Sequence, residues 1–341
     1  MPRWRTLLIG GALAGAGALS IGAADNYFEI SKNLEIFNEL YKELNIYYVD
    51  DTSPGKLMKT GIDAMLGSLD PYTNFIPESD IEDYRFMTTG QYGGIGALIR
   101  RKDDKVYISE PYEGFPSAKA GIWAGDEIYK VDGREVRGMD TDEVSKLLKG
   151  QAGTTVEVTM LRGDAAPMEY SLTREEIKIP DVPYKGFLDA DSTVGYIKLN
   201  SFTQTASHEV RTAFKELKDH GMQRLVFDLR GNGGGLLREA VNIVNLFVPK
   251  GELVVETKGR IAEWDKTYRT LSEPLDTEMP MVVLVDGGSA SASEIVSGAL
   301  QDLDRAVILG ERTFGKGLVQ QTRDLFYNSK LKVTVAKYYI P

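Results

Sequence analysis

The sequence contains no cysteine and only two histidines, His208 and His220, among its 341 residues. The absence of cysteine excludes a thiolate nucleophile, a disulfide framework and a cysteine-ligated metal. Both histidines fall in or beside one helical stretch, so a Ser-His-Asp triad has little material from which to form. We therefore expect no metal site and no cofactor.

Positive charge is also in deficit. The 50 acidic residues outnumber the 40 basic ones, which gives a formal net charge of −10 at pH 7. A nucleic-acid-binding protein needs a concentrated basic surface, so nucleic acid is not expected as a partner. The length is sufficient for two or three globular domains.

The N-terminus has the pattern of an export segment. Arg3 and Arg5 precede a run without charge from Leu7 to Ala24, and small residues end that run. This order is typical of a signal peptide, whereas an uncleaved membrane anchor is the alternative. We expect the protein to be exported to the periplasm or cell envelope, with residues 1–24 as signal peptide or anchor.

Three further regions differ in pattern. Residues 25–85 have apolar side chains at helical spacing, which predicts a helical N-terminal region. Residues 86–172 consist of short β-type runs separated by Gly, Pro and Asp-Gly, with one helix from Thr141 to Leu148, which predicts a compact β-rich domain. In residues 173–341 helices alternate with apolar strands, which predicts an α/β core with a mainly parallel sheet and flanking helices.

In this α/β region we expect the helices at 208–220 and 237–247. The expected strands are 193–199, 223–229, 281–285, 306–309, 317–322 and 331–339. The chain stops directly after the last of these strands. We interpret that ending as a truncated C-terminus.

A serine-rich turn is the sharpest local signal. The apolar run Met281–Val285 is followed by Asp-Gly-Gly, then by Ser289, Ser291 and Ser293 alternating with alanines, and then by an apolar helix pattern. Small residues at a strand-to-helix turn expose a serine oxygen and admit a substrate backbone. The N-terminus of a helix also offers backbone N–H groups to an oxyanion. The alternative is that these serines only cap the helix.

Lys316 lies between two glycines, after an apolar strand. Such flanks allow the backbone to turn so that the ammonium points inward. To act as a general base, a lysine must lower its pKa from about 10.4 to roughly 7–8, which burial can achieve. Gln320, four residues later, can hold the lysine side chain in position. The alternative role of Lys316 is that of a phosphate ligand. A second serine–lysine spacing, Ser329 to Lys332, begins a strand, and we interpret it as chance.

A glycine-rich turn, Gly231-Asn-Gly-Gly-Gly235, joins a predicted strand to a predicted helix. Such turns can bind phosphate, but this one lacks the Gly-Lys-Ser/Thr ending of a nucleotide P-loop and the full dinucleotide spacing. Its N–H groups suit a peptide backbone or an oxyanion better. A nucleotide-binding enzyme would need ATP affinity that nothing else in the sequence supports.

Taken together, the serine turn, the Phe-Gly-Lys-Gly segment and the Asp-Leu-Arg-Gly-Asn-Gly-Gly-Gly segment closely resemble the carboxyl-terminal processing peptidases, also called tail-specific proteases. The resemblance implies that Ser291 is the nucleophile, Lys316 the general base and Gln320 the support of that lysine. It also places the oxyanion site at the glycine turn and the serine turn. The candidate donors there are Gly231, Gly233, Gly234 and the N–H of Ala292.

The resemblance extends upstream and begins at about residue 35. Gly93-Gly-Ile-Gly-Ala97 and Gly121-Ile-Trp-Ala-Gly125 are similar to the family's inserted PDZ domain, and Asp70-Pro-Tyr-Thr-Asn-Phe75 is similar to the segment before it. A glycine-rich loop can receive a peptide carboxylate, and the next strand can pair with the peptide. The expected peptide-binding residues are Gly94, Ile95, Gly96, Ala97, Val144 and Leu148.

The resemblance implies a serine endopeptidase that recognises C-terminal tails and forms an acyl-enzyme. A PDZ-bearing binding protein without activity is the alternative, and the intact Ser291, Lys316 and Gln320 favour the peptidase. The expected partners are protein or peptide substrates with exposed C-termini. Membrane anchoring through the N-terminus and a homo-oligomer formed by the N-terminal helices are also expected.

Overall fold

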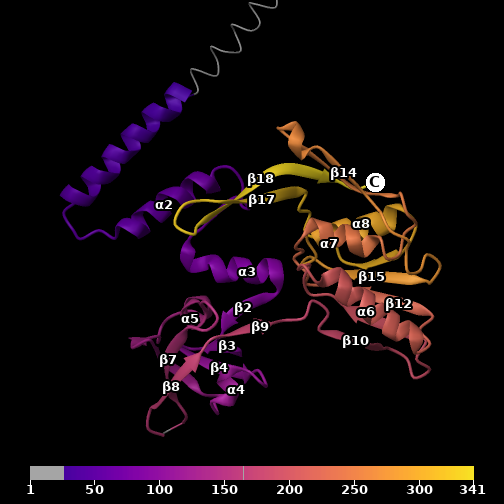
Figure 1. Ribbon diagram of the computed structural model, residues 1–341, viewed down its shortest axis with the longest axis horizontal. Helices are drawn as coiled ribbons and strands as arrows, with labels where there is room; N and C mark the ends of the chain where they lie inside the picture. Colours follow the sequence, from indigo (N-terminus) through magenta and orange to yellow (C-terminus); the bar gives the residue numbers. More distant parts are fainter. Residues whose placement is uncertain (1–26, 164) are drawn as a thin grey trace, which may run out of the picture. The chain divides into compact units, whose positions relative to one another are not determined.

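The computed structural model describes residues 27–163 and 165–341, so the predicted signal or anchor at residues 1–24 lies outside the described residues. The chain divides into two compact units after Ser68. Each unit is described by itself, with its helices and strands labelled as in Figure 1.

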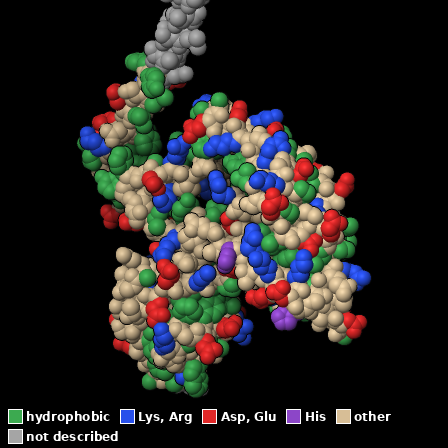
Figure 2. All heavy atoms as spheres, turned by 45° about the vertical axis from the view of Figure 1, so that its right-hand side comes forward, with side chains coloured by type: hydrophobic (Ala, Val, Ile, Leu, Met, Phe, Trp, Pro, Cys, Tyr) green, Lys and Arg blue, Asp and Glu red, His purple; other side chains and the backbone are tan. Residues whose placement is uncertain are grey.

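The first unit is helical, as predicted. It contains a helix over residues 27–47 and α2 (Pro54–Gly67), whose proline lies in the first turn, where its missing N–H costs no hydrogen bond. Many of its apolar side chains stay at the surface, among them Phe28 at 72% and Val49 at 87% exposure (Figure 2). None of the helices in the described residues is long and apolar enough to cross a membrane.

The second unit begins with a tight turn. The carboxylate of Asp70 accepts the N–H groups of Tyr72 and Thr73 at 2.7 and 2.9 Å and the hydroxyl of Thr73 at 2.8 Å. This bonding closes residues 70–73 into a turn. The short strand β1 (Asn74–Ile76), the 3-10 turn η1 (Glu78–Asp80) and helix α3 (Ile81–Thr89) follow.

A β-rich domain is inserted next. Strands β2 (Gln91–Gly94) and β9 (Glu175–Lys178) pair where the chain enters and leaves it. Its sheet has the order β3-β4-β5-β7-β8, with β6 beside β5. The elements are β3 (Ala97–Lys102), β4 (Lys105–Pro111), α4 (Pro116–Lys119), β5 (Glu127–Val131), β6 (Arg134–Glu135), α5 (Thr141–Leu148), β7 (Thr155–Leu161) and β8 (Met168–Thr173).

Local signals predicted two details of this domain correctly. Helix α5 has the predicted limits, because Asp140 and Glu143 form a capping box: each side chain accepts the backbone N–H of the other, at 2.8 and 3.0 Å. Asp132 and Gly133 both have positive φ, 48° and 77°, as a two-residue hairpin requires, and they join β5 to β6.

The α/β core contains a sheet of order β10-β11-β12-β15-β16. Neighbours from β11 to β16 are parallel and β10 is antiparallel, so the predicted mainly parallel sheet with flanking helices is confirmed. Its elements are β10 (Tyr184–Phe187), β11 (Val194–Lys198), α6 (Ala206–Asp219), β12 (Arg224–Asp228), α7 (Leu237–Val244), β15 (Met281–Val285), α8 (Ala292–Asp302) and β16 (Val307–Gly310). Phe202, Phe214, Phe227 and Phe247 are fully buried in the core.

The last two predicted strands belong to a different sheet. β17 (Leu318–Asp324) and β18 (Lys330–Tyr339) form a hairpin, and β18 also pairs with β13 (Leu253–Gly259) and β1. The connection between them is too short for a parallel crossover, so they cannot extend the parallel sheet as the sequence analysis assumed. β14 (Lys266–Arg269) lies beyond β13, after the 3-10 turn η2 (Ala262–Trp264).

Candidate active site

The glycine turn and the serine turn meet at one edge of the parallel sheet. They follow β12 and β15, which are neighbours, and the carboxyl ends of parallel neighbours lie side by side. The N–H of Ala290 donates to the carbonyl of Asn232 at 3.0 Å. A Cβ added to Gly234 would lie 2.6 Å from the Ala290 carbonyl oxygen and 2.9 Å from Ser291 Cβ. Glycine is therefore required at this point of contact.

Burial distinguishes the three serines of the turn. Ser289 and Ser293 are fully buried, and their hydroxyls donate to the carbonyls of Leu229 and Asn232 at 2.9 and 2.8 Å. These two bonds hold the serine turn against the glycine turn. Ser291 is partly exposed, and its hydroxyl donates no hydrogen bond to any residue that the structure describes; as the N-cap it faces only the backbone N–H of Glu294, which it can accept. Ser291 is thus the serine available for chemistry.

The backbone at Ser291 is strained. Its φ is 56° and its ψ is −110°, a conformation that L-residues rarely adopt and that costs of order 1–3 kcal/mol. Ser291 occupies the N-cap position of α8, so the capping alternative describes its place on the helix. A strained serine between a strand and a helix is also the arrangement of a nucleophile elbow.

The carboxylate of Glu294 holds the two predicted catalytic residues in place. Its Oε2 accepts the backbone N–H groups of Ser291 and Lys316 at 2.7 and 3.0 Å. Its Oε1 accepts the N–H of Gly315 at 2.6 Å and the hydroxyl of Thr313 at 2.9 Å. One side chain therefore joins the start of α8 to the loop that carries the lysine. Glu294 was not among the residues expected from the sequence, although a serine followed three residues later by glutamate is the signature of a capping box.

The Lys316 ammonium is half-buried and lies 4.5 Å from the centre of the Tyr72 ring. Within the described part of the chain, no carboxylate approaches it to ion-pair distance. Burial lowers its pKa, and the positive charge of Lys332 lowers it further, whereas Asp70 and Glu294 act in the opposite direction. A lysine with a lowered pKa suits the role of a general base.

Gln320 is connected to Lys316 indirectly. Its amide donates to the hydroxyl of Thr334 at 3.2 Å, and the N–H of Thr334 donates to Thr73 Oγ1 at 3.2 Å. Thr73 belongs to the turn that carries Tyr72. No direct hydrogen bond between Gln320 and Lys316 occurs in residues 27–163 and 165–341. Support of the lysine by Gln320 stays a prediction.

The four predicted oxyanion donors are not equally free. The N–H of Gly231 donates to Asp286 Oδ1 at 2.8 Å, and that of Gly234 donates to the side chain of the asparagine two residues earlier at 2.9 Å. The N–H groups of Gly233 and Ala292 find no acceptor among the residues described. Ala292 begins α8, where the first N–H groups of a helix are unpaired and its dipole favours negative charge. Gly233 and Ala292 are therefore the better donors.

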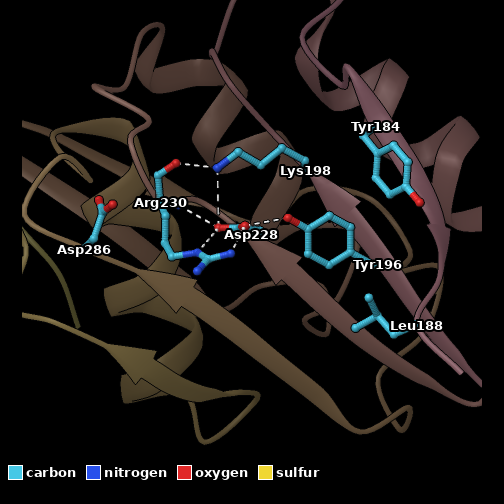
Figure 3. A pocket seen from close by; sticks show the side chains of 7 residues that line it. All are labelled: Tyr184, Leu188, Tyr196, Lys198, Asp228, Arg230 and Asp286. Carbon is cyan, nitrogen blue, oxygen red and sulfur yellow. Dashed lines mark hydrogen bonds and ion pairs between the residues drawn. The ribbon is translucent and has the colours of Figure 1, made fainter.

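A buried carboxylate supports the base of the glycine turn (Figure 3). Asp228, 1% exposed, accepts the Arg230 backbone N–H and guanidinium at 2.7–3.0 Å and the Tyr196 hydroxyl at 2.6 Å. Burial alone would raise the pKa of Asp228, but these hydrogen bonds and the nearby Lys198 lower it. The carboxylate remains charged and fixes the chain where it leaves β12. These residues line an open cavity of about 690 Å³ together with Tyr184, Leu188 and Asp286.

The predicted peptide-binding residues lie around β3 and α5. They are Gly94 at the end of β2, Ile95 and Gly96 in the connection to β3, Ala97 at the start of β3, and Val144 and Leu148 on α5. Within the described strands β3 pairs with β4 alone, so its other edge is available to an added strand. The side chains of Ile95, Val144 and Leu148 are at most 5% exposed and form part of the domain core. Their contact with a peptide stays a prediction.

Comparison with known proteins shows the family of this chain. The family model described as Peptidase family S41 matches residues 193–341, and a PDZ domain model matches residues 93–167. The carboxy-terminal-processing protease of Bartonella bacilliformis is 36% identical over 315 residues, which cover 91% of this chain and 71% of that protein. The chain belongs to peptidase family S41.

Further relatives of this S41 chain are similar over the same region. A probable CtpA-like serine protease of Staphylococcus aureus is 38% identical over 312 residues, and the chain spans 62% of its length. The solved photosystem II D1 C-terminal processing protease is 33% identical, with coverage of 89% of this chain and 87% of that one and a TM-score of 0.49. A putative S41 protease from Bacteroides fragilis has a TM-score of 0.50 at 17% identity, over 86% and 81% of the two chains.

The substitution Glu294→Gln tests whether the Glu294 carboxylate holds the segments of Ser291 and Lys316 in position. An amide has one acceptor oxygen where the carboxylate has two, so the backbones of Ser291 and Lys316 will shift relative to each other. We expect roughly a 100-fold loss of kcat with little change in KM, as is typical of a small misplacement of reacting groups. Peptide-cleavage kinetics will measure it, with the exposed Glu311→Gln in the same loop as control. Equal kinetics for the two variants would contradict this role of Glu294.

Proposed function

We propose that this protein is a serine endopeptidase that cleaves proteins after recognising their C-terminal tails. One observation carries the proposal. A single carboxylate, that of Glu294, binds the backbone of Ser291 and of Lys316, while the lysine side chain stays half-buried without a carboxylate partner in the described chain. A free serine hydroxyl and a lysine with a lowered pKa are the two groups that a Ser–Lys peptidase requires.

The chemistry follows from these groups. Uncharged Lys316 accepts the proton of the Ser291 hydroxyl, and the serine oxygen attacks the carbonyl carbon of the substrate peptide bond. The N–H groups of Ala292 and Gly233 stabilise the oxyanion. The Lys316 ammonium then returns the proton to the leaving amine, which produces the acyl-enzyme. A water molecule, deprotonated by Lys316, hydrolyses that ester.

The inserted PDZ domain supports tail recognition. A loop rich in glycine precedes β3, whose outer edge pairs with no described strand, and a peptide that pairs with such an edge presents its carboxylate to the loop. Substrates with a free C-terminus are therefore the proposed partners.

The N-terminal region supports two further proposals. Export to the periplasm or cell envelope rests on the charge and apolar pattern of residues 1–24. This segment would be either a signal peptide that is cleaved or an anchor that stays in the membrane. A homo-oligomer contact rests on the exposed apolar side chains of the unit that ends at Ser68.

The substitution Ser291→Ala is expected to abolish proteolysis of an unfolded protein substrate and to leave folding intact. The reason is that Ser291 alone in its turn has a free, accessible hydroxyl. Product formation, followed by mass spectrometry, will measure the loss, with Ser329→Ala as control. Activity near wild type in Ser291→Ala would assign the nucleophile to Ser289 or Ser293, whose hydroxyls are buried here.

The substitution Lys316→Arg should be as inactive as Lys316→Ala, because arginine keeps its charge and cannot accept a proton. In the wild type kcat should rise with pH as Lys316 deprotonates, and burial places that rise below the ordinary lysine pKa. The pH dependence of kcat will test this. His208→Ala and His220→Ala are the controls and should leave kcat unchanged. Partial rescue by arginine, or an essential histidine, would exclude the Ser–Lys mechanism.

Blocking the substrate's C-terminus tests tail recognition. Amidation of the C-terminal carboxylate should lower kcat/KM for a whole-protein substrate by about 10-fold or more, because charge-assisted hydrogen bonds to the loop are lost. A short peptide that contains only the cleavage site serves as the control and should not respond. An equal response of both substrates would mean that the PDZ domain has a structural role only.

A further inference from the structure

The cavity beside the glycine turn has no part in the proposed chemistry (Figure 3). Three neighbouring strands supply its lining, because Tyr184 of β10 pairs with Lys198 of β11, and Lys198 pairs with Asp228 of β12. Paired residues of neighbouring strands point to the same face of a sheet. Helices α6 and α7 pack on the opposite face, around Phe227. The cavity, of about 690 Å³, is therefore open to a ligand from solvent.

Arg230 is fixed in the wall of this cavity and has unused N–H groups. Its Nε and Nη2 donate to the two carboxylate oxygens of Asp228 at 3.0 and 2.7 Å. Two parallel bonds of this kind hold a guanidinium in one orientation. A guanidinium has five N–H groups, and the remaining three find no acceptor among the described residues. Because the side chain is 51% exposed, these groups are available to a ligand.

Lys198 adds a second positive charge to the same wall. Its ammonium donates to the backbone carbonyl of Arg230 and lies 3.5 Å from Asp228 Oδ1. The carboxylate of Asp228 is buried, and its oxygens are already used by donors from its own surroundings. The charges that face the cavity at this point are therefore those of Arg230 and Lys198.

Asp286 is the lining residue that opposes a negative ligand. Its Oδ1 accepts the N–H groups of Gly231 and Gly288 at 2.8 and 2.9 Å, and these bonds lower the pKa of Asp286, so that it is charged. An anion must therefore bind on the side of Arg230 and Lys198 that faces away from Asp286.

That side of the cavity is apolar. In Figure 3, Tyr184, Leu188 and Tyr196 lie on one side of Arg230, and Asp286 lies on the other. The rings of Tyr184 and Tyr196 are in contact, with their centres 5.8 Å apart. A ligand that combines a carboxylate with a short hydrocarbon stem fits both parts of this lining, since the stem packs on the apolar wall while the carboxylate meets the guanidinium.

The cavity is within reach of the bond that is cleaved. Arg230 is three residues before Gly233, a proposed oxyanion donor, so their Cα atoms are at most about 11 Å apart. Four residues of an extended substrate span about 13 Å. A substrate side chain within about four residues of the cleaved bond can therefore enter the cavity.

We propose that this cavity is a specificity subsite, which binds an acidic side chain of the substrate within about four residues of the cleaved bond. The carboxylate binds Arg230 and Lys198, and its stem packs against Tyr184 and Leu188. The proposal rests on the proposed peptidase function and adds to it a preference for sequence near the cleaved bond, separate from recognition of the tail.

Peptides with both ends blocked test the subsite, because they have no terminal carboxylate. One position at a time, from four residues before the cleaved bond to four residues after it, carries Glu or Gln. At one position we expect kcat/KM to be about 10-fold higher for the Glu peptide, because it gains charge-assisted hydrogen bonds. The ratio should decrease as ionic strength rises. A ratio near one at every position would overturn the proposal.

Variants of the two cations assign this preference to the cavity. Arg230→Gln should bring the Glu/Gln ratio to about one, and Lys198→Gln should lower it. Because the ratio compares two peptides on the same variant, a general loss of activity does not change it. Arg224→Gln is the matched control, since Arg224 is exposed at the other end of β12, and it should keep the wild-type ratio. An unchanged ratio in Arg230→Gln would also overturn the proposal.

Binding to the Ser291→Ala protein separates the subsite from the peptidase function. In isothermal titration calorimetry, the Glu peptide should bind about 10-fold more tightly than the Gln peptide, and addition of Arg230→Gln should remove the difference. Cleavage by the wild type without a Glu preference would exclude the subsite and retain the peptidase. Binding that depends on Glu and Arg230, without any cleavage, would retain the subsite and exclude the peptidase. The absence of both would exclude both.

Discussion

The active site depends on one carboxylate. Glu294 has four close donors, two from the peptide groups of Ser291 and Lys316 and two from Gly315 and Thr313. The loop after β16 has one further link to the serine turn, a backbone hydrogen bond from the N–H of Phe314 to the carbonyl of Ser289 at 3.0 Å. Because its acceptor sites are used by these donors, Glu294 fixes the distance between the segments that carry Ser291 and Lys316. The same bonds keep Ser291 in a strained conformation.

The fold supplies the two other constraints on the site. Parallel neighbours β12 and β15 bring the glycine turn against the serine turn, and the hydroxyls of Ser289 and Ser293 bind the two turns together. The antiparallel sheet then brings the turn around Tyr72 to the lysine, through the pairing of β1 with β18. The surroundings of Lys316 are therefore built by segments about 260 residues apart in the chain, as the bond between Thr73 and Thr334 shows.

The sequence predicted the parts of the site that depend on local backbone. Glycine flanks and small residues indicated Ser291 and Lys316, and the limits of β15 and α5 followed from apolar runs and caps. Which of the three alternating serines is free could not be predicted, because burial against the glycine turn decides it. Nor could the contact of the Tyr72 ring with Lys316, since it depends on the pairing of β1 with β18. The Ser329–Lys332 spacing was set aside as chance, and the structure gives Lys332 different neighbours.

This chain has no cysteine, and both of its histidines are exposed on or beside α6. The general base proposed for it is therefore a lysine whose pKa is lowered by burial. A histidine has a pKa near neutrality without help, but a lysine reaches that range only if its charged form is made unfavourable. Burial does so at a cost to folding, and nearby carboxylates reduce the effect. Asp70 and Glu294 cannot be removed, because one forms the turn and the other holds the backbone.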